Sequence, residues 1–88
     1  MLNANLTVLN ETGVHMRPAQ ILVTKLAPLN CQVTIKRLDK DINAKSIMMV
    51  MAAALKKGHE VEVVCQGPDE AAALNLVTEF FQGVMDDA

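Results

Sequence analysis

The chain has 88 residues, the size of one domain, and we expect a single domain spanning residues 1–88. It has no tryptophan and no tyrosine, which disfavours nucleic-acid modules that stack bases on aromatic rings. No apolar run is long enough to cross a membrane, and the first residues lack the basic region of a signal peptide. We therefore expect a cytoplasmic protein that neither inserts into membranes nor binds nucleic acid directly.

The formal net charge is −2, but the charges are unevenly distributed along the chain. All eight Lys and Arg lie in residues 1–57 together with three acids, which gives that part a charge of +5. Residues 58–88 carry seven acids and no Lys or Arg, which gives −7. A solvated acidic helix near the C-terminal end explains most of this asymmetry, while the positive part could also receive an acidic partner or a phosphate.

The two cysteines, Cys31 and Cys65, are far apart in the sequence, and neither lies in a CxxC or Cys/His pattern. Such a spacing offers no set of ligands for a metal ion. We therefore expect both cysteines to be reduced and structural, and we expect no metal and no cofactor.

The first part of the chain is typical of a strand followed by a helix. Residues 2–9 alternate between apolar and polar side chains, which predicts a half-buried strand, and residues 10–13 should form a loop. From about Met16 the apolar residues return at helical spacing, and Pro28 sets the limit of that helix. The side chains expected to face inward are Leu2, Ala4, Leu6 and Val8 in the strand and Ala19, Leu22, Val23 and Leu26 in the helix.

Alternation returns in residues 31–37, where Val33 and Ile35 should point inward. We expect a turn over Leu38–Asp41 and then a short strand near Ile42. The Asn-Gly pair that marks a tight hairpin is missing here.

A second helix is predicted between Ser46 and Gly58. Serine is a good N-cap, and glycine is common just after the last helical residue. Lys56 and Lys57 would favour the negative end of the helix dipole.

The last strand is predicted over residues 60–66, and the last helix begins near Asp69, because Gly67 and Pro68 interrupt the alternation. The side chains expected to be buried are Val61, Val63 and Cys65 in the strand and Leu74, Val77, Phe81 and Val84 in the helix. The complete order is β-α-β-β-α-β-α, which favours an α+β domain with one sheet and its helices on one face.

The stretch GVHMRPAQ, residues 13–20, places polar groups at the start of a helix. The first N–H groups of a helix have no partner within it and carry a partial positive charge, so that end attracts anions. Arg17 adds a fixed cation whose planar fork matches phosphate oxygens. His15 has an imidazole that is nucleophilic when neutral, and much of it is neutral at cellular pH.

These groups could accept a phosphoryl group and hold it, but no second acid or base stands beside them in the sequence to hydrolyse it. The alternative is an ordinary loop or capping histidine, which is the usual role of a histidine before a helix. His59, between Gly58 and Glu60, has no such neighbours and is expected to be a surface residue.

Ser46 precedes the methionine-rich sequence IMMVM. Helix capping explains the serine, and a phosphate there would be locally favourable while adding charge to the surface. Met48, Met49 and Met51 cannot all face inward from one helix, so at least one should be exposed as an adaptable apolar contact. Loose packing of a small core is the competing explanation for these methionines.

Two motifs in this chain resemble those of HPr, the family of histidine-containing phosphocarrier proteins of the bacterial phosphoenolpyruvate-dependent sugar phosphotransferase system (PTS). The active-site pattern G-x-H-x-R-P-A is matched by Gly13, His15, Arg17, Pro18 and Ala19. The pattern around the regulatory serine is matched by Lys45, Ser46, Ile47 and Met48. The resemblance covers essentially the whole chain, and the separation of the two motifs also fits.

The resemblance implies an open-faced β-sandwich, in which three helices cover one face of a four-stranded antiparallel sheet. It implies that His15 is phosphorylated on Nδ1 by phosphorylated enzyme I and passes the group to a histidine of an enzyme IIA domain, with Arg17 balancing the phosphate charge. It further implies that Ser46 matches the site of an ATP-dependent HPr kinase/phosphorylase found in some bacteria. Such a protein is a stoichiometric carrier in sugar transport and not an enzyme, and we expect a monomer.

Partners of such carriers dock around His15 and the second helix. The positions that match contact residues are Met16, Gln20, Lys45, Ile47, Met48, Met49 and Met51. Met16, Gln20 and Met49 depart from the sugar-type carriers and make this face less basic and more apolar, and Leu38–Asp39 replaces a common Asn-Gly turn. Two alternatives stay open: a carrier of a nitrogen-related regulatory PTS branch, or an interaction module that acts through phospho-Ser46 and leaves His15 idle.

Overall fold

The computed structural model describes residues 1–10 and 16–83. Their secondary structure follows the order predicted from the sequence, β-α-β-β-α-β-α. The strands are β1 (Leu2–Thr7), β2 (Gln32–Arg37), β3 (Lys40–Asn43) and β4 (Glu60–Gln66). The helices are α1 (Met16–Leu26), α2 (Ile47–Ala52) and α3 (Glu70–Phe81).

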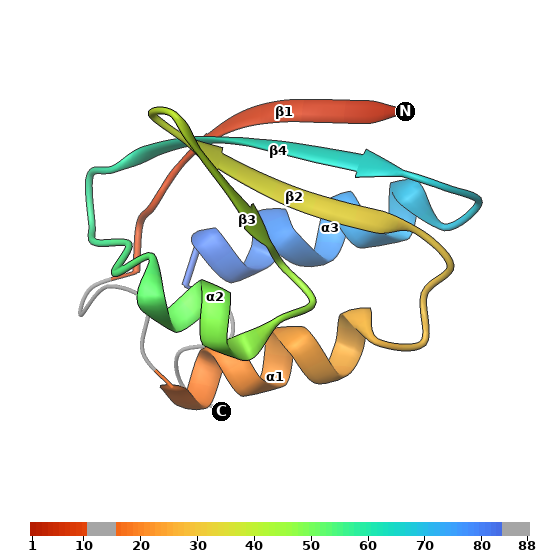
Figure 1. Cartoon of the computed structure of the whole chain (residues 1–88), viewed down its shortest axis with the longest axis horizontal. Helices are drawn as coiled ribbons and strands as arrows, with labels where there is room; N and C mark the ends of the chain where they lie inside the picture. Colours follow the sequence, from red (N-terminus) through yellow and green to blue (C-terminus); the bar gives the residue numbers. More distant parts are fainter. Residues whose placement is uncertain (11–15, 84–88) are drawn as a thin grey trace.

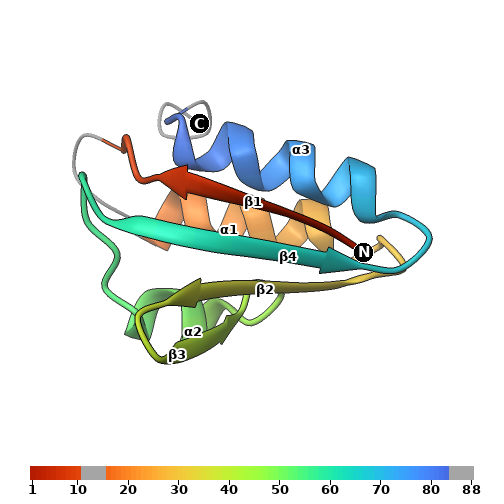
Figure 2. The ribbon, with the colours of Figure 1, turned by 90° about the horizontal axis from the view of Figure 1, so that it is seen from above.

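The four strands form one antiparallel sheet in the order β1-β4-β2-β3, and they run side by side in Figure 2. All three helices lie on the same side of this sheet (Figure 1). In the described part of the chain, no helix covers the other side of the sheet. The arrangement confirms the predicted α+β class and the open-faced β-sandwich.

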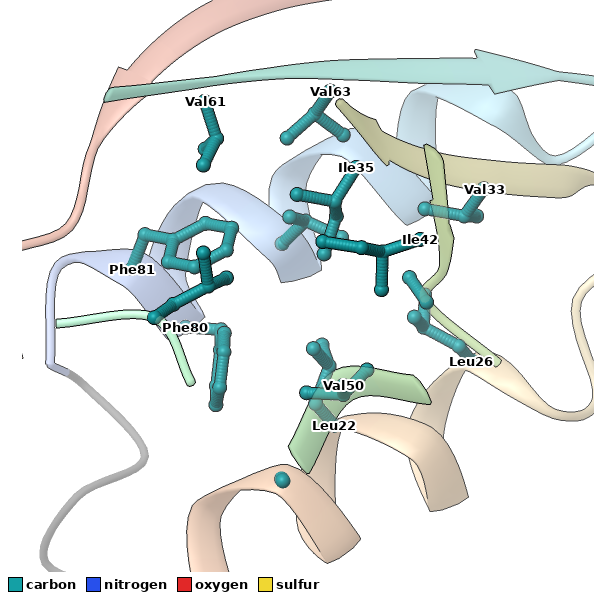
Figure 3. Packing of buried hydrophobic residues seen from close by; sticks show 14 of the residues in the cluster. Leu22, Leu26, Val33, Ile35, Ile42, Val50, Val61, Val63, Phe80 and Phe81 are labelled. Carbon is teal, nitrogen blue, oxygen red and sulfur yellow. The ribbon is translucent and has the colours of Figure 1, made fainter. Parts of the chain in front are cut away.

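The core lies between the sheet and the helices. Side chains alternate across a strand, so every second residue of β2 and β4 points toward the helices. These inward residues are Val33, Ile35, Val61, Val63 and Cys65, all of them buried as predicted. Leu22 of α1 and Val50 of α2 approach them from the helical side, and Figure 3 shows the two sets of side chains pointing toward each other. Phe80 and Phe81 of α3 pack edge to face, with ring centroids 5.1 Å apart.

The second helix is shorter than the sequence predicts. It ends at Ala52 and not near Gly58, because Ala54 has a φ of 50°, and an α-helix cannot continue through this left-handed conformation. Leu55 then packs into the core from outside the helix. The predicted role of Lys56–Lys57 at the helix end is therefore wrong, since both lysines follow the helix by several residues.

The turn between β2 and β3 is tighter than the sequence predicts. Strand β3 begins at Lys40, directly opposite Arg37, so the strands are joined by Leu38 and Asp39 alone. Leu38 takes the left-handed conformation with a φ of 57°, although leucine has no preference for it. The predicted turn over Leu38–Asp41 is thus two residues too long, and the hairpin closes through Leu38 and Asp39 without an Asn-Gly pair.

A few side chains differ from their predicted environment. Leu2 is exposed, because it lies at the start of the edge strand β1. Val23 and Leu74 are half-buried, and the buried face of α3 consists of Ala73, Val77, Phe80 and Phe81. Val84, expected to be buried, lies outside the described residues.

Both cysteines are free thiols, and Cys65 is fully buried in β4. Burial raises the pKa of the Cys65 thiol from its usual 9.0 to about 11, with further contributions from Cys31 and from the carboxylate of Glu70. A thiol in this environment is a packing group at neutral pH and not a nucleophile.

The free energy of unfolding should therefore fall as the pH rises from 9 to 11. In that interval the cysteine of the unfolded chain has lost its proton while Cys65 of the folded chain keeps it, so alkali favours unfolding by on the order of 2 kcal/mol. Urea denaturation at several pH values should show this slope in the wild type and a weaker slope in Cys65→Ala. Cys31→Ala serves as the matched control and should retain most of the slope. An equal slope in Cys65→Ala and the wild type would contradict the assignment.

Candidate functional site

The first turn of α1 has a buried side and an exposed side. Pro18 and Ala19 are buried and hold the turn against the core, whereas Met16, Arg17 and Gln20 face outward. Proline is tolerated here because the N–H groups of a first helical turn have no partner within the helix. The motif R-P-A thus combines one exposed cation with two anchoring residues.

The start of α1 is electrostatically suited to an anion. Its first turn has no acidic residue, so the N–H groups and the helix dipole leave a partial positive charge there. Arg17 is exposed, and among the described residues its guanidinium has no ion-pair or hydrogen-bond partner. A dianionic group at this helix end would therefore meet an available cation. The predicted acceptor, His15, comes directly before this turn in the sequence and lies outside the described residues.

The segment that leads from β1 toward the motif is fixed at its last described residue. Asn10 is fully buried, and its Nδ2 donates a hydrogen bond to the backbone carbonyl of Phe80, 2.8 Å away near the end of α3. The backbone N–H of Leu9 donates to the carbonyl of Phe81, also at 2.8 Å. Sequence reasoning placed Asn10 in an ordinary loop, because no local pattern indicates a partner 70 residues away.

We expect Asn10→Ala to lower the free energy of unfolding by about 1–3 kcal/mol, because it removes a buried hydrogen bond and leaves space in the interior. Asn3→Ala is the matched control: the Nδ2 of Asn3 donates to Glu62 at 2.9 Å on the exposed face of the sheet, and its loss should cost less than about 0.5 kcal/mol. Urea denaturation of both variants makes the comparison. Equal losses would mean that Asn10 is no special anchor.

The start of α2 is held by two neighbouring side chains. Ser46 caps the helix as predicted, because its Oγ accepts a hydrogen bond from the backbone N–H of Met49 at 3.3 Å. Lys45 was expected to contact partners, but its Nζ donates to the backbone carbonyl of Leu29 at 2.6 Å and is half-buried. This contact joins the segment after α1 to the start of α2, and sequence reasoning did not anticipate it.

Helices α1 and α2 pack against each other and together carry most of the predicted docking residues (Figure 1). Met48 is 80% exposed and Met16 is 58% exposed. The expectation that at least one methionine of α2 is exposed is therefore confirmed. Ile47 and Met51 are half-buried and pack against the core, so they offer less surface than predicted.

His59 is half-buried and not the free surface residue expected from the sequence. Its Nδ1 accepts a hydrogen bond from the backbone N–H of Lys56 at 3.0 Å. That nitrogen is therefore occupied within the fold.

The described residues contain no group of three or more His, Cys, Asp or Glu side chains that could hold a metal ion. Within the same residues, every helix is too short or too polar to span a bilayer.

Comparison with known proteins gives consistent results. A family model described as "PTS HPr component phosphorylation site" matches residues 2–83. The chain is 40% identical over 87 residues to the phosphocarrier protein HPr of Treponema pallidum, covering 99% of both chains. It is 38% identical over 80 residues to the multiphosphoryl transfer protein of Salmonella typhimurium, covering 88% of this chain but 21% of that much longer protein.

Solved structures agree with the sequence matches. The fold superposes on the crystal structure of HPr-C-His from Thermoanaerobacter tengcongensis with a TM-score of 0.82 and 30% identity, covering 94% of this chain and 97% of the other. The shared fold, the sequence motif that leads into α1 and these matches lead to one conclusion. The chain belongs to the HPr family of phosphocarrier proteins of the phosphotransferase system.

Proposed function

We propose that this HPr protein accepts a phosphoryl group on His15 from phosphorylated enzyme I and donates it to a histidine of an enzyme IIA domain in sugar uptake. The observation that carries the proposal is the first turn of α1, which lacks acids and exposes Arg17, a cation with no ion-pair or hydrogen-bond partner among the described residues. A helix end of this kind, directly after His15 in the sequence, suits a group that arrives and leaves with a double negative charge.

The chemistry requires a nucleophile and a charge cradle. The neutral imidazole of His15 attacks phosphorus, the P–N bond to the donor histidine breaks, and the donor imidazole keeps the electron pair. Reversal of these roles passes the group to the next histidine. Such a transfer depends on positioning and electrostatic stabilisation. The chain acts in this scheme as a stoichiometric carrier, turned over by its partner phosphotransferases.

Incubation with purified enzyme I and labelled phosphoenolpyruvate tests this role. We expect uptake of about one acid-labile phosphoryl group per chain, loss of the label on addition of an enzyme IIA domain, and no uptake without enzyme I. Failure to take up phosphate from enzyme I would contradict the proposal. Release of the label only to a nitrogen-related IIA domain would assign the protein to the regulatory PTS branch.

A regulatory role for Ser46 is supported by its place at the N-cap of α2, beside the exposed Met48 and Met49. A negative charge at Ser46 would lie on the surface proposed to meet acidic or apolar partners. We expect Ser46→Asp to slow phosphorylation by enzyme I roughly tenfold, which corresponds to about 1.4 kcal/mol.

Ser46→Asn is the matched control, because asparagine also caps helices well but adds no charge. It should transfer phosphate at close to the wild-type rate. A similar loss of rate in both variants would mean that the cap geometry matters and the charge does not. Incubation with ATP and an HPr kinase should produce acid-stable phosphoserine in the wild type. Formation of phosphoserine alone, with no phosphohistidine under any condition, would favour a purely regulatory module.

A further inference from the structure

A groove of about 380 Å³ lies between the β2–β3 hairpin and α2. Its lining residues are Arg37, Leu38, Lys40, Asp41, Ile42, Met49, Ala52 and Ala53. Met49, one of the predicted docking residues, lines this groove, whereas Arg17 and Ser46 do not. The combination of apolar side chains with a few charged groups, at this volume, is typical of sites for small molecules.

Two cations lie directly opposite each other at this groove. Arg37 of β2 and Lys40 of β3 are partners in the strand register. Lys40 is two residues before the buried Ile42 in β3, and Arg37 lies opposite Lys40. Both side chains therefore lie on the same face of the hairpin as Ile42, the face that carries α2. Like charges in directly opposed positions repel each other. Among the described residues, neither side chain has an ion-pair or hydrogen-bond partner.

The acidic residue of the groove does not neutralise this pair. Asp41 contributes to the lining, but its register partner is Lys36, and the alternation of the strands assigns both of them to the opposite face of the hairpin. In the described part of the chain no ion pair joins Asp41 to Arg37 or Lys40. Among the described residues, two positive charges therefore lie without an ion pair beside an apolar surface.

Apolar side chains at the same groove are left in water. Leu38 is 86% exposed and also holds a left-handed backbone conformation that is unfavourable for leucine. Met49 is 42% exposed. A ligand that covered these two side chains would bury apolar surface that the fold itself leaves open.

We propose that this groove binds a free small molecule that combines one anionic group with a short apolar body. The anionic group lies between Arg37 and Lys40 and relieves their repulsion. The apolar body packs on Ile42, Met49 and Ala53. The small volume of the groove and the paired cations favour such a molecule over a protein segment, which would need a larger apolar area.

Octanoate is a suitable probe, and titration into the ¹⁵N-labelled full-length chain is followed by NMR. We expect saturable amide shifts at low-millimolar octanoate, centred on Ile42, Met49 and Ala53. Octanol, which lacks the charge, and acetate, which lacks the apolar body, should each bind at least tenfold more weakly. Absence of saturable shifts with octanoate, or shifts centred elsewhere, would overturn the proposal.

Variants separate this site from a general attraction between anions and a basic surface. The double variant Arg37→Gln/Lys40→Gln should bind octanoate at least tenfold more weakly, whereas Lys36→Gln, which removes a charge from the other face, should bind normally. Without ligand, the double variant should also melt at a slightly higher temperature, because the repulsion is gone. Equal weakening by Lys36→Gln would sink the proposal. The proposal would also be wrong if octanoate produced no shifts at the groove while an acidic amphipathic peptide did.

Discussion

Changing Arg17 to glutamate is expected to slow phosphoryl transfer from enzyme I by roughly 100- to 1,000-fold while the fold is preserved. Arg17 is exposed at the first turn of α1, and its removal breaks no ion pair or hydrogen bond among the described residues. A carboxylate near a helix N-terminus is itself slightly stabilising. The loss would therefore come from repulsion between the new carboxylate and the transferred phosphoryl group.

Lys25→Glu is the control for this variant. It makes the same change of charge on the same helix, but in the last turn of α1 instead of the first. Rapid-quench measurement of the transfer rate and urea denaturation should be carried out on both variants. An Arg17→Glu protein that transfers phosphate at the rate of Lys25→Glu would show that the local cation is dispensable.

Changing Gly67 to alanine is expected to lower the free energy of unfolding by about 2–4 kcal/mol. A Cβ atom at this position would lie 2.5 Å from the carbonyl oxygen of Asn30 and 2.6 Å from the Cα of Cys31. Both contacts are with backbone, so no flexible side chain can move aside. The φ of 142° at Gly67 adds conformational strain for any L side chain.

Gly58→Ala separates the two causes. Gly58 also has a positive φ, 94°, but a Cβ there would have no atom within 4 Å. Its replacement should cost about 1–2 kcal/mol from backbone strain alone. Urea denaturation of both variants gives the comparison. If Gly58→Ala were as costly as Gly67→Ala, the close approach of Gly67 to the backbone of Asn30 and Cys31 would have no energetic importance.

The strand and helix order was predictable because the apolar residues repeat with clear periods. Residues such as Val33, Ile35, Val61 and Val63 alternate inward without exception, and they are buried as expected. The end of α2 was not predictable, because AAALKK continues a helix-forming composition. The helix ends at Ala52, Ala54 takes a left-handed φ, and Leu55 is then buried in the core, a tertiary contact that the local sequence does not encode.

The candidate site also has some features that the local sequence predicts and others that depend on tertiary contacts. Local sequence motifs contain Arg17, the anchoring Pro18 and the helix cap Ser46. These three residues could therefore be recognised from the sequence alone. The hydrogen bonds of Asn10 to Phe80 and of Lys45 to Leu29 join residues 70 and 16 positions apart. No local pattern encodes such contacts, and they became visible only in the folded chain.

We predict that His15, and not another group, carries the phosphoryl group. The chain offers an internal comparison, because the Nδ1 of His59 already accepts a hydrogen bond from the backbone of Lys56. Long-range ¹H–¹⁵N NMR spectra of the imidazole rings, recorded before and after phosphorylation by enzyme I and phosphoenolpyruvate, test the claim directly. We predict that Nδ1 of His15 shifts on phosphorylation, that His59 is unchanged, and that His15→Ala takes up no acid-labile phosphate. A phosphoryl group on His59, or full uptake by His15→Ala, would contradict it.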